Sequence, residues 1–255
     1  MNIELKKKLI SLELSDLAEA IEKQENDTSL IGKSFNERIE ILSEEISTIR
    51  YNKLVAKLIN NACFKYSSAS IISIDTDLRG INKDIIMNLG ELGFIESATN
   101  IMIIGPTGSG KTYLGCALGV ESCKNAYRTY YIRMQDLTRK IDDYTSSPRL
   151  LKMFLKRLSN YKLLIIDEWL TNKPSERDIK FLYELIDSRN DIYSTIFITQ
   201  FDIDTWHERL GGGQHADSIM DRLLSNHYEV PSSENNIRKI LGKEKADSFV
   251  KTLKK

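Results

Sequence analysis

The sequence predicts an α/β fold in which a parallel sheet flanked by helices follows a small all-helical N-terminal domain. From Asn100 onward, short apolar runs alternate with helical segments, a pattern typical of a parallel sheet wrapped by helices. One of these runs, "LLII", is apolar at every position, as expected of a strand buried on both faces. In the first 66 residues, apolar residues recur only at the spacing of amphipathic helices.

The composition sets limits on the class of protein. The chain has 255 residues, enough for one ordinary domain and a smaller one. Lys plus Arg and Asp plus Glu both number 36, so the net charge gives no overall indication of a polyanionic partner. The N-terminus is too polar for a signal peptide, no apolar run is long enough to span a bilayer, and the cysteines lack metal-ligand spacing. We therefore expect a cytoplasmic protein with no membrane partner.

The predicted organisation is a helical domain over residues 1–66, a linker over 67–98 and the sheet domain over 99–255. Ser34 and Glu37 form a capping-box pair at the start of a long predicted helix. The sheet domain contains five predicted strands and ends in one or two polar helices over 233–255. The predicted strands are 101–105, 128–133, 162–167, 194–199 and 227–230.

The segment "GPTGSGKT" follows the first predicted strand and opens a predicted helix, which is the context of a phosphate-binding loop. Glycines allow its backbone N–H groups to point inward, and the helix N-terminus favours anions. Lys111 is expected to reach the β- and γ-phosphates of ATP, and the Thr112 hydroxyl to bind Mg²⁺. The predicted ATP-binding residues are Gly105, Pro106, Thr107, Gly108, Ser109, Gly110, Lys111 and Thr112.

Acidic and polar residues follow two other predicted strands. Asp167 and Glu168 end the apolar run 162–167, and ligands of open α/β sheets bind outside the carboxyl ends of strands. We expect Asp167 to hold the Mg²⁺ shell beside Thr112, and Glu168 to polarise an attacking water. Thr199 and Gln200 end another strand; they either sense the γ-phosphate or serve ordinary turn chemistry.

Two late arginines are further candidates. Arg222 lies on a predicted helix, where it could complete the site of a neighbouring subunit and stabilise charge on the γ-phosphate. From the residues alone, an ion pair between Arg222 and a nearby acid is the simpler interpretation. Arg238 is either a phosphate sensor or a solvated helix residue.

These segments together resemble the IstB family of transposition helper ATPases, which is related to the DnaC-type helicase loaders within the AAA+ class. The resemblance extends over nearly the whole chain, including "SFNERIEIL", "DLRGINKDIIMNLGELGFI", "LLIIDEW", "TQFDIDTWHE" and "DSIMDRLLSN". It implies a P-loop AAA+ core without a separate lid domain, and ATP-dependent assembly on DNA that delivers a transposase. It also implies that Arg222 is an arginine finger, Arg238 a sensor II residue, and Thr199 and Gln200 the sensor I position.

A possible DNA-binding surface lies in the N-terminal domain. No acidic residue occurs between Glu45 and Asp75, and Arg50, Lys53 and Lys57 share one helix face in this stretch. Such a face suits the phosphates of double-stranded DNA, although a simple solvated helix face is the alternative. The segment "IELKKKLISLEL" is also able to dock a partner protein through its apolar side.

Four functions fit this sequence. The first is a DNA-assembled ATPase that helps a transposase and forms homo-oligomers through ATP at subunit interfaces. The second is a helicase loader of the DnaC type. The third is a small-molecule kinase, although Glu168 directly after Asp167 favours attack by water over transfer to an acceptor. The fourth is a nucleotide-binding module without turnover.

Overall fold

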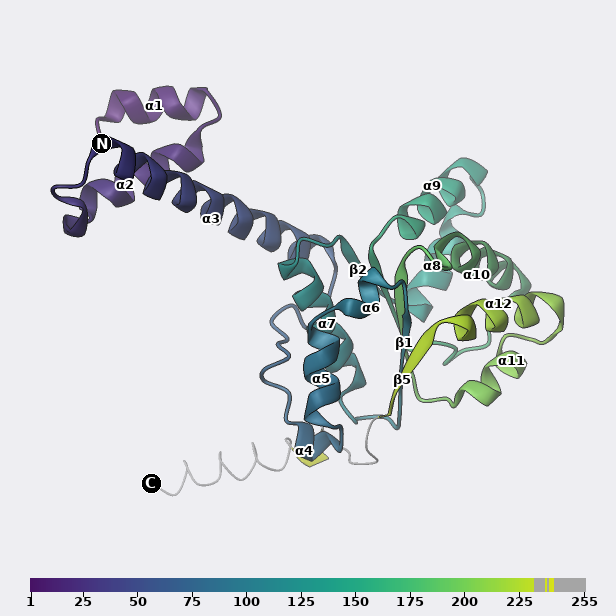
Figure 1. The fold of residues 1–255 in the computed structure, drawn as a ribbon. Coiled ribbons are helices and arrows are strands. Elements are labelled where there is room, and N and C mark those ends of the chain that lie inside the picture. Colours follow the sequence, from purple (N-terminus) through teal and green to yellow (C-terminus); the bar gives the residue numbers. More distant parts are fainter. Residues whose placement is uncertain (232–236, 238, 241–255) are drawn as a thin grey trace, which may run out of the picture. The chain divides into compact units, whose positions relative to one another are not determined.

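The computed structural model describes residues 1–231, 237, 239 and 240, and it divides into two compact units, Met1–Lys57 and Leu58–Lys255. Figure 1 shows the elements of both units. The first unit ends earlier than the predicted domain boundary after residue 66. Arg238 and most of the predicted C-terminal helices lie outside the described residues. Among the described helices, none is long and apolar enough to cross a membrane.

The first unit is helical. It consists of α1 (Ile3–Ser11), α2 (Ser15–Asn26), the short 3₁₀ helix η1 (Thr28–Leu30) and most of α3 (Phe35–Asn61). Its small core joins Ala20 to Leu42 and Ile49. The predicted capping box is confirmed, because the Ser34 N–H donates to the Glu37 carboxylate (2.7 Å) and the Glu37 N–H donates to Ser34 Oγ (3.4 Å).

The second unit is built on a five-stranded sheet, as the sequence predicts. The strands are β1 (Asn100–Ile104), β2 (Thr129–Arg133), β3 (Leu163–Asp167), β4 (Ser194–Thr199) and β5 (His227–Pro231). Their order is β2-β3-β4-β1-β5, and all four pairings are parallel. The central strands β1, β3 and β4 therefore present their carboxyl ends at one edge, where a ligand of such a sheet binds.

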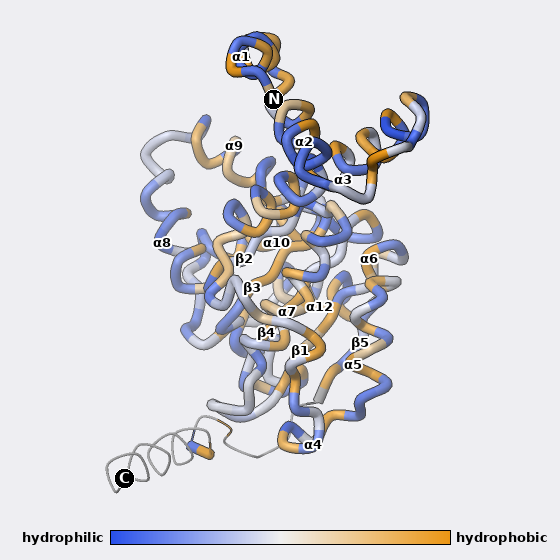
Figure 2. The backbone as a smooth tube through the Cα atoms, turned by 90° about the vertical axis from the view of Figure 1, so that its left-hand side faces the viewer, coloured by the Kyte–Doolittle hydropathy of each residue, from blue (hydrophilic) through white to orange (hydrophobic). Residues whose placement is uncertain are grey.

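Helices cover both faces of this sheet (Figure 1). Alternate residues of each strand enter two different cores: Ile103 and Ile165 face one core, whereas Met102 and Leu164 face the other. The first face is covered by α5 (Lys83–Gly90), α6 (Gly93–Glu96) and α7 (Lys111–Lys124). The second is covered by α8 (Met134–Tyr144), α9 (Pro148–Ser159), α10 (Glu176–Arg189), α11 (Trp206–Arg209) and α12 (Gly213–Ser225). Hydrophilic and hydrophobic residues alternate along the helices in Figure 2, as this packing requires.

Helix α7 approaches the sheet closely through a glycine. A Cβ atom at Gly119 would lie 2.5 Å from Phe64 Cε1 and 2.8 Å from Ile165 Cδ1, so a larger residue there would force one of these side chains to shift. This contact fixes α7 against β3 and thereby holds its N-terminus at the carboxyl edge of the sheet. The edge strand β2 is anchored as well, because the Tyr131 N–H donates to the Ala62 carbonyl (2.8 Å).

Candidate nucleotide site

The loop between β1 and α7 has the backbone that phosphate binding needs. Gly108 and Gly110 have φ angles of 91° and 86°, in the left-handed region where a side chain is strained. The N–H of Gly105 donates to the Thr199 carbonyl (3.3 Å), which ties the loop to the end of β4. The loop then leads directly into the first turn of α7, whose free N–H groups favour an anion.

The side chain of Lys111 folds back into this loop. Its ammonium donates to the carbonyl oxygens of Pro106 (2.6 Å) and Gly105 (2.5 Å). Burial lowers the pKa of Lys111 to about 8, and the negative charge of Asp167 only partly opposes that shift. The cation is therefore held in the loop and partly shielded from water, so an anionic ligand interacts with it strongly.

Thr112 and Asp167 form a pair of oxygen ligands. The Thr112 hydroxyl donates to Asp167 Oδ2 at 2.9 Å. Two neighbouring ligands of an octahedral Mg²⁺ at about 2.0–2.1 Å are separated by about 2.9 Å, so these two oxygens fit adjacent positions on that ion. Asp167 is buried, with only 2% of its surface exposed. The pair therefore fits the Mg²⁺ that accompanies a bound nucleotide.

Glu168 lies at a sharp turn after β3. Its backbone has a φ of 58°, which is unfavourable for a residue with a side chain. Two hydrogen bonds hold the turn: the Glu168 N–H donates to Asp167 Oδ1 (2.8 Å), and the Trp169 N–H donates to the Ile198 carbonyl (2.8 Å). With Trp169 fully buried, the turn directs Glu168 away from the core, and Glu168 lies at the margin of a cavity.

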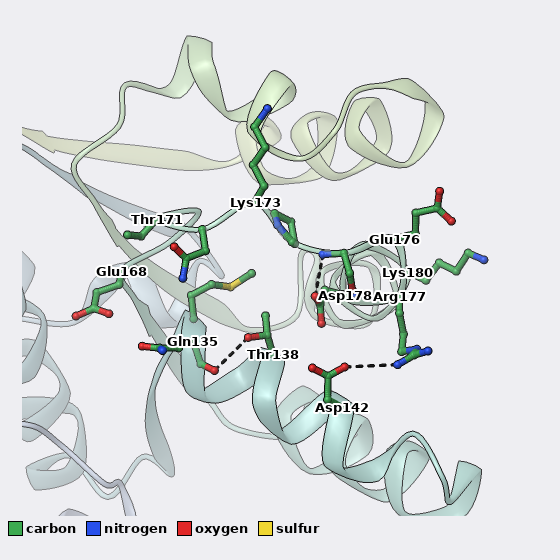
Figure 3. A pocket seen from close by; sticks show the side chains of 14 residues that line it. Gln135, Thr138, Asp142, Glu168, Thr171, Lys173, Glu176, Arg177, Asp178 and Lys180 are labelled. Atoms are coloured by element: carbon green, nitrogen blue, oxygen red, sulfur yellow. Dashed lines mark hydrogen bonds and ion pairs between the residues drawn. The ribbon is translucent and has the colours of Figure 1, made fainter.

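This cavity has a volume of about 740 Å³ and is lined by α8, residues 171–175 and the first turns of α10. Figure 3 shows Glu168 at one end of it and the ion pair between Arg177 and Asp142 (3.4 Å) at the other. The lining is mostly polar and charged, so it suits water and charged groups better than an apolar ligand. Glu168 thus lies beside a space that water can enter.

The two polar residues at the end of β4 differ in their contacts. The Thr199 hydroxyl is buried, donates to the Trp169 carbonyl (2.8 Å) and accepts from the Phe201 N–H (3.2 Å). Gln200 is exposed, and its Oε1 accepts from the Thr107 hydroxyl of the phosphate loop (2.9 Å). The Thr199 hydroxyl therefore stabilises the turn, and Gln200 is the side chain of this pair that reaches the phosphate loop; a sensor role for either residue stays a prediction.

Two residues at the site were not predicted from the sequence. The Tyr131 hydroxyl, from β2, donates to Asp167 Oδ2 (2.7 Å), and burial, followed by the charge of Asp167, raises the pKa of this tyrosine. Arg79 ends α4 (Thr76–Arg79), and its guanidinium donates to the Gly110 carbonyl (2.9 Å). A Cβ atom at Gly110 would lie 1.8 Å from Arg79 Nη1, so the glycine makes room for this contact.

Sequence signals for these two residues were weak. Tyr131 is one of two adjacent tyrosines in an apolar strand, and only the pairing of β2 with β3 decides which of them meets Asp167. Arg79 lies in the "LRG" part of the predicted linker, among other charged residues such as Asp77 and Lys83, so its charge did not distinguish it.

Arg222 makes the ion pair that the residues alone favoured. Its Nε donates to Asp187 Oδ1 (2.8 Å), and its Nη2 lies 2.7 Å from the same oxygen. Its Nη1 donates to the Ser218 carbonyl (3.0 Å), and the guanidinium lies 5.1 Å from the ring centre of Tyr183. Within one subunit, Arg222 is therefore held against α10, and its role as an arginine finger stays a prediction.

The basic face of α3 is not free of acids in the folded unit. Asp16 of α2 accepts hydrogen bonds from both Arg50 (3.2 Å) and Lys53, and Glu19 lies 3.5 Å from Lys53. The hydrogen bond from Lys53 is the main cause of the lowered pKa of Asp16. The acid-free run in the sequence therefore did not reveal that acids from another helix pair with two of the three predicted cations, and DNA binding by this face stays a prediction. Lys57 is exposed.

Similarity to known proteins agrees with this geometry. The family model described as IstB-like ATP binding protein matches residues 7–246. The protein y4uH of Sinorhizobium fredii, whose name refers to an insertion sequence and to ATP binding, is 28% identical over 91% of this chain and 93% of its own length. The ATP-binding protein of the insertion sequence IS232 of Bacillus thuringiensis is 31% identical over 78% of this chain and 79% of its own length.

Solved structures share the fold at lower identity. A DnaC helicase loader is 16% identical, with a TM-score of 0.54 over 66% of this chain and 99% of its own. DnaA from Aquifex aeolicus with bound AMPPCP is 21% identical, with a TM-score of 0.53 over 71% of this chain and 55% of its own. The second unit therefore has the fold of these AAA+ domains. Together with the phosphate loop, these findings show that the chain belongs to the family of IstB-like ATP binding proteins.

Proposed function

We propose that this protein is an ATPase that assembles on double-stranded DNA under the control of ATP and assists the transposase of an insertion sequence. One observation carries the proposal: Lys111, Thr112, Asp167 and Glu168 meet at the carboxyl edge of one parallel sheet, with Thr112 bonded to Asp167. Family membership and the relatives named for insertion sequences support the biological setting.

Each residue of this group has a defined task in hydrolysis. Lys111 neutralises the β- and γ-phosphates, while Thr112 and Asp167 hold Mg²⁺, which supplies charge stabilisation when bound. Glu168 accepts the proton of the attacking water, and the cavity beside it admits that water. Tyr131 keeps the Asp167 carboxylate in place through its hydrogen bond (2.7 Å). Gln200, bonded to Thr107 of the loop, is the candidate sensor of the γ-phosphate.

Assembly follows if Arg222 acts on the nucleotide of a neighbouring subunit. ATP bound within one subunit cannot by itself explain why subunits would associate. A phosphate that receives Arg222 from a neighbour becomes part of the interface, so ATP favours assembly and loss of the γ-phosphate weakens it. In the ion pair with Asp187, the carboxylate is 52% exposed and the arginine side chain 25%, so water reaches the pair and a doubly charged phosphate can compete for Arg222.

The first unit offers a surface for a protein partner. None of the residues of α1 is buried, and several large apolar side chains of this unit are exposed. These are Ile3, Leu5, Ile10, Leu12, Ile31, Phe35, Ile39, Tyr51 and Leu54. Exposed apolar surface of this kind marks a contact with another protein, and we assign it to the transposase.

A helicase loader of the DnaC type is the second candidate, because the solved DnaC loader shares the fold. In that case the apolar surface of the first unit would bind a replicative helicase instead. Pull-down of the purified protein with the transposase of its own element and with a replicative helicase separates the two functions.

The central experiment measures assembly on DNA by sedimentation with a labelled duplex, with ATP, with ADP and without nucleotide. We expect large complexes on the duplex only in the sample that contains ATP, and not with ADP or without nucleotide. Glu168→Gln should bind ATP normally, hydrolyse it about 10²–10⁴-fold more slowly, and hold the complex longer, because the amide keeps the shape and loses the base. Complexes that form equally well without nucleotide would disprove control by ATP, and wild-type turnover in Glu168→Gln would remove Glu168 from the mechanism.

A further inference from the structure

Helix α9 carries a second basic face. Its cations Arg149, Lys152 and Lys156 are spaced i, i+3 and i+7, the same spacing as the predicted cations of α3. No acidic residue occurs between Asp143 and Asp167, so the segment is also acid-free in the sequence.

In the folded protein, the cations of this face have no acidic partner among the described residues. Arg149, Lys152 and Lys156 are all exposed, and among the described residues none of them has an acidic oxygen within the 4.0 Å of an ion pair. Of the three acids of α8, Asp136 pairs with Arg133 and Arg139, and Asp142 pairs with Arg177. Asp143 makes no ion pair with the cations of α9 within 4.0 Å.

The stability of α9 does not explain these cations. Phe154 and Leu158 anchor the opposite face of the helix in the core, so the basic face is not needed for packing. Arg149 lies in the first turn, where the positive end of the helix dipole disfavours a cation, and this turn contains no acidic residue. Leu150 and Met153, which are 47% and 58% exposed, lie among the cations.

We propose that the face of α9 formed by Arg149, Lys152, Lys156 and Met153 binds the phosphate backbone of DNA. The inference rests on the proposed function, and it assigns the DNA contact to the second unit in place of α3. An exposed set of unpaired cations attracts a polyanion and releases its counterions. A membrane surface fits less well, because the large apolar residues of α9 are mostly turned into the core.

The test compares three full-length variants in a titration of a labelled duplex with AMPPCP at several salt concentrations. Replacing Arg149, Lys152 and Lys156 together with Ala should weaken binding about tenfold or more and lower the salt slope by up to about 2.7, or about 0.9 per phosphate contact. The matched control replaces Arg50, Lys53 and Lys57 with Ala and should retain both affinity and slope. A second control, Arg149→Lys with Lys152→Arg and Lys156→Arg, keeps the charge and should bind like the wild type.

Each result has a clear meaning. Binding of AMPPCP must be unchanged in all variants, which shows that the site for nucleotide is intact. If the α9 variant retains affinity and slope while the wild type binds DNA, the inference is wrong and the proposed function stands. If the wild type binds no duplex with any nucleotide, the proposed function fails as well. If the α9 variant instead loses assembly without DNA, or binding to an acidic protein or to anionic vesicles, the face has another partner and the inference is overturned.

Discussion

The carboxyl edge of the sheet and the basic face of α3 both contain charged residues that were predicted from the sequence to be functional. The surroundings of these charges differ. At the sheet edge, Asp167 is 2% exposed and is held by Thr112 and Tyr131. On α3, the side chains of Arg50 and Lys53 are 59% and 53% exposed and pair with Asp16.

This difference decides how much each charge can do. A buried charge held by short hydrogen bonds acts strongly on a ligand because little water screens it. An exposed ion pair gains little and is screened further by salt. The following predictions test that contrast, beginning with the largest expected effect.

Lys111→Ala should reduce ATP affinity by more than about a thousandfold. The loop then lacks its cation, and the phosphates remain without a partner at a partly buried site. Direct titration of ATP measures the effect, and thermal unfolding of the ATP-free variant checks that the fold is intact. Unchanged affinity in a folded variant would show that the loop does not bind the phosphates.

Arg222→Ala should lower hydrolysis about a thousandfold in the assembled protein while ATP binding to the monomer stays nearly intact. Asp187→Asn should have a smaller effect in the other direction. The change weakens the ion pair that holds Arg222, so ATP-dependent assembly should become a few-fold stronger. Sedimentation and turnover of both variants measure this.

A mixture of Arg222→Ala with Glu168→Gln is the sharper test of a shared site. Some interfaces in the mixture contain both an intact Glu168 and an intact Arg222, so activity should partly recover. No recovery, together with normal assembly of Arg222→Ala, would place Arg222 outside the mechanism.

ATP affinity should fall as the pH rises above about 8. Burial lowers the pKa of Lys111 to about 8, and bound phosphates favour the ammonium, so the pKa is higher in the complex. Between these two pKa values, binding takes up a proton, and affinity decreases by at most about tenfold per pH unit. The phosphates themselves titrate near pH 6 and do not contribute. Titrations from pH 7 to 10 measure the slope; a flat profile would contradict the assignment, and Lys111→Arg should be flat because arginine stays charged.

Asp16→Asn should have the smallest effect. The change releases Arg50 and Lys53 from their ion pairs, and duplex affinity should rise by at most about threefold at low salt and not at all near 0.2 M salt. The titration of a labelled duplex described for α9 measures this change in affinity. A rise above about tenfold would reveal α3 as a masked DNA-binding face and would remove the contrast between the two regions.

The sequence by itself determined the features that depend on neighbours along the chain. The five strands, the capping box of Ser34 and Glu37, and the loop of Gly108 and Gly110 were predictable because periodicity, capping and backbone freedom are local properties. The meeting of Thr112 and Asp167 was also predictable, since parallel strands bring their carboxyl ends to one edge.

Only the tertiary structure decided which distant side chains meet. The order β2-β3-β4-β1-β5 places Tyr131 beside Asp167, and the fold of the linker brings Arg79 to Gly110. Helical spacing identified the cations that share a face on α3, but it could not show that Asp16 of α2 lies against that face. The equally spaced cations of α9 make no ion pairs, because the described part of the fold brings no acid within 4.0 Å of them. A partner's identity depends on packing between elements far apart in the sequence, and no local pattern encodes that packing.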